Sequence, residues 1–233
     1  MKRLCSICAR GGSKGVVGKN LREVDGKPLL AYSIEQAQKS GLFDAIAFSS
    51  DSDDILNAAR DAGVKYLIKR PAELATDTAA KIPVIRHCAE EAEKMSGIRF
   101  DTFVDLDCTS PLRDVQDIIN AVEMLEAGGC DNVITGMPAR RSPYFNLVEL
   151  KDGFVELSKK LERPVVRRQD APQCYDLNAS IYVWNRESFF HSQSLFTGKT
   201  KIYVMPEERS LDIDTQFDFE IVTSLLRKKN EAR

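Results

Sequence analysis

Apolar runs of strand length alternate along the chain with stretches whose apolar positions have helical spacing. The runs predict strands at residues 4–9, 45–49, 65–68, 102–107 and 132–136. The stretches between them predict helices at residues 31–40, 53–62, 82–95 and 115–127. This alternation indicates an α/β fold with a doubly wound, mostly parallel sheet covered by helices on both faces. In such sheets, ligands bind beyond the carboxyl ends of the strands, near the switch in strand order.

The pattern changes after residue 136. Residues 137–173 are rich in Arg and Pro, and residues 151–153 predict the turn of a hairpin. A regular strand returns at residues 179–184, and a helix is expected over residues 215–229. We interpret residues 137–175 as an arm inserted into a single domain that spans residues 1–233, rather than as a second domain.

The length and charge of the chain exclude several functional classes. The chain has 233 residues, enough for one compact α/β domain. Its 33 Lys and Arg against 35 Asp and Glu give a formal net charge of −2, which argues against nonspecific binding of nucleic acid. No apolar run approaches the roughly 20 residues of a membrane helix, and the N-terminal apolar stretch is too short for a secretory signal. We therefore expect a cytoplasmic protein that meets anionic partners through basic residues gathered at a site.

The six cysteines include one C-x-x-C pair, Cys5 and Cys8, which raises the question of zinc or redox chemistry. No second such pair exists, and the two histidines, His87 and His191, are far from it in sequence. The pair also lies inside the first predicted strand, where a free Cys behaves as a small core residue. We expect core packing rather than a metal or redox site.

The loop after the first predicted strand concentrates glycine and positive charge. Residues 9–20 read Ala-Arg-Gly-Gly-Ser-Lys-Gly-Val-Val-Gly-Lys-Asn. The glycines allow a ligand to approach the backbone closely, and Arg10, Lys14 and Lys19 suit a triphosphate. The alternative is a flexible, solvated basic loop. Residues 9–20 do not form a Walker A loop, because Asn20 stands where Ser or Thr is required. They also lack the dinucleotide pattern Gly-x-Gly-x-x-Gly. We interpret it as a phosphate-binding loop.

This loop resembles the N-terminal motif of the acylneuraminate cytidylyltransferases, the family that includes the CMP-sialic acid synthetases. That family closes a Rossmann-like sheet around CTP. Residues 49–52, which helix capping alone would also explain, and residues 70–77 are similar to two further motifs of the family. The resemblance implies that the nucleotide is bound by Arg10, Gly11, Gly12, Ser13, Lys19, Asn20, Ser50, Asp51 and Arg70.

The chain departs from the family at two points. Where the family reads Leu-Gln-Pro-Thr-Ser-Pro-Leu-Arg, with the Gln helping to hold the sugar, this chain has Asp107 and Cys108 before an unchanged Thr-Ser-Pro-Leu-Arg. A variant of this kind resembles a subgroup associated with legionaminic and related nonulosonic acids. Asp107 is expected either to hydrogen-bond an altered sugar substituent or to add a metal ligand. A hydroxyl-rich run that often follows residue 77 in relatives is Thr-Ala-Ala-Lys here, ending at Lys81.

The arm and the strand after it carry the expected contacts to an acidic sugar. Arginines at positions 140, 141, 167 and 168 either form ordinary surface ion pairs or supply the planar forks that a carboxylate requires. Residues 175–182 resemble the family's Tyr-x-x-Asn-Gly-x-Ile-Tyr, with Ala179 in place of Gly. The resemblance implies that the sugar is bound by Asp107, Thr109, Ser110, Arg113, Arg167, Arg168, Gln169, Tyr175, Asn178, Tyr182, Phe189 and Phe190.

An Asp-Ile-Asp segment near the C-terminus predicts a cation site. Asp212 and Asp214 alternate on an extended segment, so their carboxylates point to one side and repel unless a cation or ligand joins them. Helix capping would explain Asp214 but not Asp212. In the family this segment binds Mg²⁺, and we expect Mg²⁺ or Mn²⁺ on Asp212 and Asp214.

Together these residues predict a cytidylyltransferase that activates an acidic nine-carbon sugar with CTP. The anomeric hydroxyl would attack the α-phosphorus with Arg10, Lys19 and Asp214 as catalytic residues, and pyrophosphate would leave. The resemblance implies a homodimer in which the arm completes the partner's active site. The alternatives are another acid sugar such as Kdo or pseudaminic acid, another nucleotide, or a non-catalytic protein that binds sugar or nucleotide.

Overall fold

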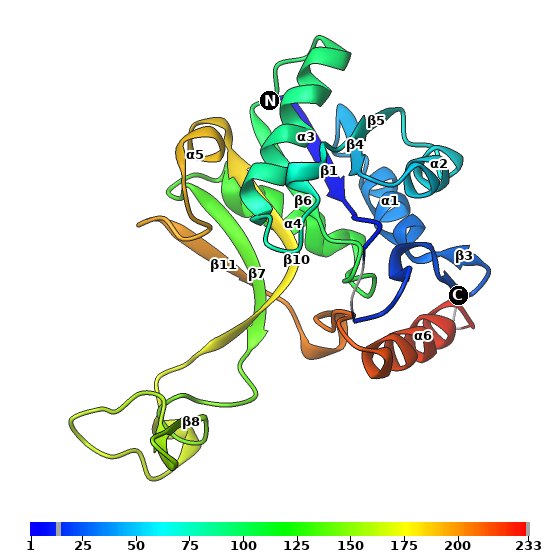
Figure 1. Cartoon of the computed structure of the whole chain (residues 1–233). Helices are drawn as coiled ribbons and strands as arrows, with labels where there is room; N and C mark the ends of the chain where they lie inside the picture. The colour runs from blue at the N-terminus through cyan, green and yellow to red at the C-terminus, as the bar shows by residue number, and fades with distance from the viewer. Residues whose placement is uncertain (13–14, 232–233) are drawn as a thin grey trace.

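A seven-stranded sheet forms the centre of the computed structural model, which describes residues 1–12 and 15–231 (Figure 1). Six strands are parallel to one another, and β10 runs antiparallel between β6 and β7. In spatial order the strands are β11 (Thr200–Val204), β7 (Asn132–Pro138), β10 (Tyr175–Asn185), β6 (Thr102–Leu106), β1 (Arg3–Cys8), β4 (Ala45–Ser50) and β5 (Tyr66–Lys69). The expectation of an α/β fold with a mostly parallel sheet is confirmed.

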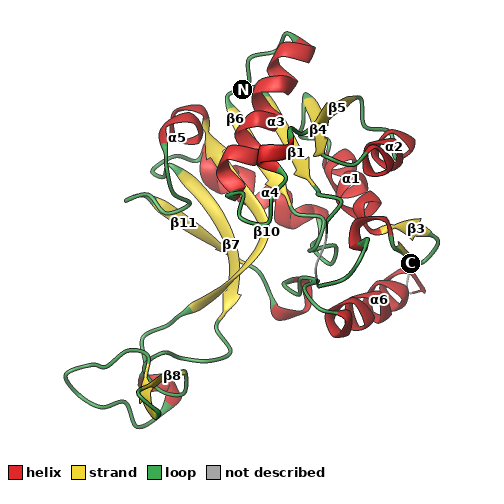
Figure 2. Ribbon diagram, in the orientation of Figure 1, coloured by secondary structure: helices red, strands yellow, loops and turns green. Residues whose placement is uncertain are grey.

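Helices cover both faces of this sheet (Figure 2). One face packs against α1 (Leu29–Ser40), α2 (Asp53–Asp61) and α4 (Val115–Glu126), and the other packs against α3 (Lys81–Ser96) and α5 (Arg186–His191). A third cluster joins α6 (Gln216–Glu231) to the small hairpin of β2 (Glu23–Val24) and β3 (Lys27–Pro28). None of the helices in the described part of the chain combines the length and apolar character needed to cross a bilayer.

Alternation along β1 explains both the continuous apolar run and the role of the C-x-x-C pair. Leu4 faces the α3 side of the sheet, whereas Cys5 and Ile7 face the α1 side. Cys8 is three residues from Cys5 and therefore packs against the opposite layer from Cys5. Cys5 is fully buried in the core, whereas Cys8 is partly buried and also lines the pocket described below.

Every strand and helix predicted from the sequence is present, with shifted ends. The elements that were not predicted are α5, β11 and the β2–β3 hairpin, all of which are short or lie at an edge. The β10 strand starts at Tyr175, four residues before the predicted start at residue 179, because its first part pairs with the end of β7 rather than with the core of the sheet.

The order of the strands creates one switch point. From β1 the chain adds β4 and β5 on one side, and then returns to place β6 on the other side of β1. The loops that follow β1 and β6 therefore diverge at the carboxyl edge of the sheet. They contain residues 9–22 and 107–114, where the sequence concentrates its chemistry.

The predicted arm leaves the body between β7 and β10 and extends away from it (Figure 1). It carries a hairpin of β8 (Val148–Lys151) and β9 (Phe154–Leu157), as the sequence predicted. The turn between them has φ of 51° at Asp152 and 83° at Gly153, the left-handed pair that a tight hairpin turn uses. A short 3₁₀ turn, η3 (Arg168–Asp170), follows the hairpin.

Ala179 adopts a left-handed conformation, with φ of 51°, where β10 shifts register between Leu177 and Tyr182. We predict that Ala179→Gly raises the free energy of unfolding by about 0.5–1 kcal/mol, because glycine avoids a steric cost that exceeds its own entropic cost. Ala47→Gly, in a buried and regular part of β4, is the matched control. It should lower the free energy of unfolding by about 1–2 kcal/mol. Urea unfolding measures both, and a loss of stability in both variants would contradict the prediction.

Candidate active site

The glycine-rich loop begins where β1 ends, and polar contacts fix its start. The Gly11 amide donates to Asp51 Oδ1 at 2.9 Å, and a Cβ at Gly11 would lie 3.2 Å from the Cβ of Ser52. The buried Asn20 donates from Nδ2 to the Arg10 carbonyl at 3.2 Å, which ties the end of the loop to its beginning. The predicted nucleotide contact Ser13 and its neighbour Lys14 lie outside the described residues.

This loop forms one wall of a pocket at the switch point. The pocket has a volume of about 240 Å³ and takes its opposite wall from the loop after β6. Its lining residues are Cys8, Ala9, Arg10, Gly15, Lys19, Asn20, Asp107, Cys108, Thr109 and Asp214. The structure thus brings together the predicted phosphate-binding cations Arg10 and Lys19, the altered sugar motif and one predicted metal ligand.

The Asp-Ile-Asp segment is tied to both walls of this pocket. Ile213 is fully buried against α6, and its amide donates to the Thr109 carbonyl at 3.0 Å. Lys19 Nζ donates to the Ile213 carbonyl at 2.5 Å and lies 3.9 Å from Asp214 Oδ1. A Cβ at Gly15 would lie only 1.9 Å from the Asp214 carbonyl oxygen, so this contact between loop and segment requires glycine.

The two carboxylates of this segment suit a hard divalent cation. Burial and the neighbouring charge of Asp214 raise the pKa of Asp212, which shows that negative charge is locally unfavourable there. Asp214 is not used as a helix cap, because Thr215 and Asp218 cap α6 through hydrogen bonds of 2.7–3.2 Å. Oxygen ligands of this kind fit Mg²⁺ or Mn²⁺. In the described part of the chain, no three acidic, His or Cys side chains gather as a metal cluster.

A charge cluster lies behind the pocket wall, with Asp105 buried and Lys81 and Asp107 half-buried. Asp107 Oδ1 accepts hydrogen bonds from the amide of Thr109 at 3.0 Å and from its hydroxyl at 2.9 Å. Asp107 Oδ2 accepts from Lys81 Nζ at 2.8 Å, and Lys81 also lies 3.4 Å from Asp105 and 4.5 Å from the centre of the Tyr182 ring.

Burial opposes charge at Asp107, but the Lys81 ammonium overcomes it and holds the pKa of Asp107 well below its usual range. Burial likewise opposes the charge of Lys81, and Asp107 and Asp105 hold the pKa of that amine well above its usual range. Lys81 was not predicted as a site residue. The available signal was that Lys81 and Asp107 both stand where the family has other residues.

Arg113, predicted as a sugar contact, is instead fully buried beneath the pocket. Its guanidinium donates to the carbonyls of Asp107 and Ser180, to the Ser33 hydroxyl and to Gln36. All of its polar edges therefore face the protein interior, and its role is to support the loop after β6.

Several other predicted sugar contacts are covered as well. Ser110 and Asn178 are buried and join the loop after β6 to β10, and Asn178 donates to Ser210 at 3.1 Å. Phe189 stacks in the core on Phe103 with a centroid distance of 4.2 Å, and Phe190 packs on the edge of this pair. The ring of Tyr182 lies under Lys81. Phe189 and Phe190 therefore lie beside the first residues of β6, whereas the pocket lies beyond its last residue.

The nucleotide contacts predicted around β4 are also engaged within the protein. Ser50 is fully buried, and the Arg70 guanidinium donates to the carbonyl of Ser49 at 2.8 Å. Arg10 forms an ion pair with Asp77, the last residue of the motif that contains Arg70. Of these groups, only Arg10 reaches the pocket lining.

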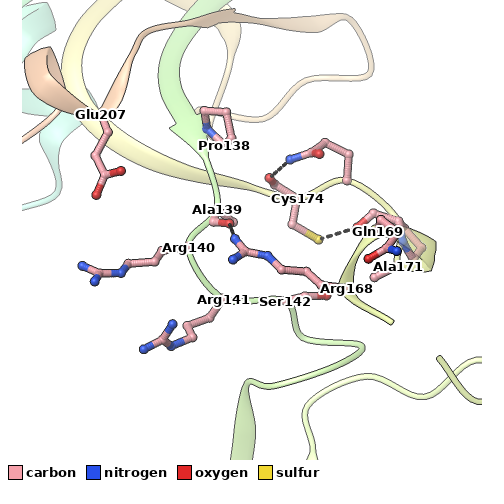
Figure 3. A pocket seen from close by; sticks show the side chains of 12 residues that line it. Pro138, Ala139, Arg140, Arg141, Ser142, Arg168, Gln169, Ala171, Cys174 and Glu207 are labelled. Atoms are coloured by element: carbon pink, nitrogen blue, oxygen red, sulfur yellow. Dashed lines mark hydrogen bonds between the residues drawn. The ribbon is translucent and has the colours of Figure 1, made fainter. Parts of the chain in front are cut away.

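The arm residues line a different hollow, of about 660 Å³, at the base of the arm (Figure 3). Arg140, Arg141 and Arg168 line this hollow. The Arg168 guanidinium donates to the Ala139 carbonyl at 3.0 Å. Gln169 also lines this hollow, whereas Arg167 pairs with Asp170 on the surface and Tyr175 is exposed. Within one chain, the structure does not bring these residues to the pocket at the switch point.

Comparisons with known proteins identify the family of this chain. A family model described as cytidylyltransferase matches residues 4–232. The chain is 46% identical over 227 residues to a CMP-N,N′-diacetyllegionaminic acid synthase from Campylobacter jejuni subsp. jejuni serotype O:2, which covers 97% of this chain and 96% of the relative. It is 33% identical over 221 residues to an N-acylneuraminate cytidylyltransferase from Streptococcus agalactiae serotype V, which covers 94% of this chain and 52% of that relative.

A solved structure of CMP:2-keto-3-deoxy-manno-octonic acid synthetase complexed with CTP superimposes with a TM-score of 0.72. The match covers 98% of this chain and all of the other. Because the two sequences are only 16% identical, the match shows a shared fold and nothing more. The ordered motifs, the family model and the high identity over nearly the whole chain lead to one conclusion: the chain belongs to the cytidylyltransferase family.

Proposed function

We propose that this chain transfers the CMP group of CTP to an acidic nonulosonic sugar of the legionaminic or sialic acid type and releases pyrophosphate. One observation carries the proposal: the cationic loop and the Asp-Ile-Asp segment meet at the switch-point pocket, joined by Lys19 and the Ile213 carbonyl. Phosphate-binding cations and acidic ligands side by side in one pocket are what a nucleotidyl transfer needs. The relative at 46% identity is named for N,N′-diacetyllegionaminic acid, which supports this class of sugar.

In the proposed reaction the anomeric hydroxyl attacks the α-phosphorus and loses its proton, and the bond from that phosphorus to the pyrophosphate oxygen breaks. Arg10 and Lys19 would take up the charge that develops on the pyrophosphate. Asp214, whose exposed carboxylate lines the pocket, would accept the proton. A divalent cation held by Asp212 and Asp214 would neutralise charge on the phosphate oxygens.

Binding of the triphosphate requires an exchange of partners at Arg10. The Arg10 guanidinium is paired with Asp77, and both side chains are partly exposed. An exposed ion pair contributes roughly 0–1 kcal/mol, so a polyphosphate with several negative charges readily replaces the single carboxylate. Because CTP is the substrate, we place the proposed enzyme in the cytoplasm.

The arm supports a proposed homodimer. On the β8–β9 hairpin, Val148 pairs with Leu157 and Leu150 pairs with Val155, so four aliphatic side chains share one face. All four side chains are exposed, and Leu150 has the largest exposed fraction, 77%. A two-stranded hairpin by itself is only marginally stable in water. A second copy of the chain covering this face would bury the aliphatic side chains and stabilise the hairpin. The arm arginines would then reach the partner's pocket and supply the cationic groups for the sugar carboxylate.

We predict that the purified protein releases pyrophosphate from CTP with Mg²⁺ and one nonulosonic acid. The assay should compare N,N′-diacetyllegionaminic, N-acetylneuraminic, pseudaminic and Kdo acids, with UTP and GTP in place of CTP as nucleotide controls. Asp212→Asn should lower kcat by at least about a hundredfold, because it removes one carboxylate from the cation site. Glu220→Gln, which changes an exposed carboxylate of α6 that bonds to Gln216, should retain most of the activity. Wild-type protein that binds sugar or CTP without releasing pyrophosphate would favour the non-catalytic alternative.

We predict that Leu150→Asp converts a dimer into monomers, because it places a charge on the aliphatic face of the hairpin. Lys151→Asp, on the opposite face of the same strand, should leave the dimer intact. Size-exclusion chromatography with light scattering measures both masses, and the same samples are assayed for pyrophosphate release. A wild-type protein that is monomeric and fully active would contradict the proposed dimer.

A further inference from the structure

The Asp-Ile-Asp segment is reached through a short turn that an ion pair fixes to the body of the protein. This turn, η4 (Glu207–Arg209), follows β11, and Asp212 lies three residues after its end. The Arg209 guanidinium binds the carboxylate of Asp117 through two parallel hydrogen bonds, of 2.8 Å from Nε and 2.9 Å from Nη2. The Asp117 side chain, in the first turn of α4, is only 1% exposed. A buried carboxylate is stable only when it is paired and hydrogen-bonded, so this pair sets the position of Arg209.

The remaining acceptor positions of Asp117 are filled as well. Its Oδ1 accepts from the Tyr203 hydroxyl at 3.2 Å, and its Oδ2 accepts from the Asp114 amide at 2.8 Å. A carboxylate has about four acceptor positions, and the protein uses all of them here. One side chain therefore joins the start of α4, the strand β11 and the turn η4. Since no acceptor position is left for a ligand, any effect of Asp117 on the reaction passes through Arg209.

The turn connects this anchor to the acidic segment through hydrogen bonds of its own. The Arg209 amide donates to the Pro206 carbonyl at 3.2 Å, and the Ser210 hydroxyl donates to the same carbonyl at 2.8 Å. The buried Ser210 also accepts from Asn178 of β10 at 3.1 Å. Three residues of extended chain span at most about 11 Å, so Asp212 cannot move far from Arg209.

The loop after β6 holds the acidic segment at two places. At its start, the Thr109 carbonyl accepts from the Ile213 amide at 3.0 Å. At its end, the Asp114 carboxylate lies 3.4 Å from Arg209 and accepts from Lys229 of α6, the helix that follows the segment. The two carboxylates of the segment therefore lie between fixed points of the backbone, although like charges at this spacing would otherwise separate.

We propose that Asp117 and Arg209 are positioning residues of the cation site, which hold the Asp-Ile-Asp segment in the geometry that binds a divalent cation. The proposal rests on the proposed function. Neither side chain lines the pocket at the switch point, so both act through the backbone of residues 210–213. Because the anchors hold the two carboxylates together before a cation arrives, binding of the cation does not have to order the segment.

A second ion pair on the same helix provides the comparison for a purely structural role. Arg3 binds Glu126, the last residue of α4, through two parallel hydrogen bonds of 2.8 Å and 2.7 Å. The Arg3 side chain is 27% exposed and that of Arg209 is 33% exposed, so the two guanidinium groups are similarly covered. Arg3 lies at the amino end of β1, however, whereas the pocket lies beyond the carboxyl end of this strand. The two pairs share their chemistry and their helix, and only one of them adjoins the acidic segment.

The first test measures how much Mg²⁺ pyrophosphate release requires. Arg209→Gln should raise the Mg²⁺ concentration for half-maximal rate about tenfold, at the low end of the effect of groups that orient metal ligands. Asp117→Asn, which breaks the pair from the other side, should act in the same direction. At saturating Mg²⁺, KM for CTP and for the sugar should stay within about twofold, because neither side chain touches a substrate. Arg209→Lys keeps the charge and loses the paired geometry, so its Mg²⁺ requirement should lie between those of Arg209→Gln and the wild type.

The second test measures the affinity of the protein for Mn²⁺ without substrates, by electron paramagnetic resonance of the free ion. Arg209→Gln should raise the Kd for Mn²⁺ about tenfold. Asp212→Asn removes a proposed ligand and identifies the binding that belongs to this site. Arg3→Gln is the matched control, and it should lower Tm without changing the Mn²⁺ affinity or the Mg²⁺ requirement. If Arg209→Gln does not fold, Arg209→Lys supplies the same comparison as the milder change.

A fall in Tm for both Arg209→Gln and Arg3→Gln, with the Mn²⁺ affinity and Mg²⁺ requirement of both unchanged, would overturn the positioning role. Mn²⁺ binding that does not depend on Asp212 would overturn it too, since the pair would then have no cation site to position. A wild type that binds Mn²⁺ at Asp212 but releases no pyrophosphate with any sugar would count against the proposed function instead. The comparison of Mn²⁺ affinities would still decide the role of Arg209 in that case.

Discussion

The architecture of the pocket depends on the buried guanidinium of Arg113. It joins α1 through Ser33, the end of β6 through the Asp107 carbonyl, and β10 through the Ser180 carbonyl. These three elements belong to different parts of the chain, and one side chain joins them at the carboxyl end of β6. A buried charge without such partners would destabilise the fold, so the hydrogen bonds that neutralise Arg113 also fix where the loop after β6 can go. The Asp107 side chain and the Thr109 carbonyl, which anchors Ile213, take their positions from that loop.

The cations of the site are each held by a group of the protein. Arg10 is paired with Asp77, Lys19 is bonded to the Ile213 carbonyl, and Lys81 is bonded to Asp107. These contacts differ in exposure, and so they differ in how easily they are exchanged for a ligand. In the proposed reaction, the more exposed pair at Arg10 would give way to phosphate at little cost, whereas the half-buried Lys81, which contacts two carboxylates, would remain in place. In the proposed reaction, the replaceable contact would serve the triphosphate and the rigid contact would serve the sugar.

The sequence predicted the layout of this protein well, and the exposure of individual side chains less well. Apolar periodicity placed the strands and helices, and the glycines and cations after β1 identified the loop that lines the pocket. Periodicity carries no information about strand direction, so the antiparallel course of β10 could not be read from it. A motif likewise gives the position of a residue but not its surroundings. Arg113 and Phe189 were predicted as sugar contacts and are buried, and Lys81 was missed because only the packing of α3 beside β6 brings it to Asp107.

The course of β10 has a consequence for how such a protein changes over evolutionary time. This strand of 11 residues begins at the arm and ends in the core, and on the way Asn178 holds Ser210, just ahead of the acidic segment. No flexible linker separates the projecting surface from the catalytic centre. In the proposed homodimer, a substitution of the arm that alters assembly would therefore also shift the backbone beside the proposed catalytic residues. We expect the two properties to drift together among descendants of this sequence rather than independently.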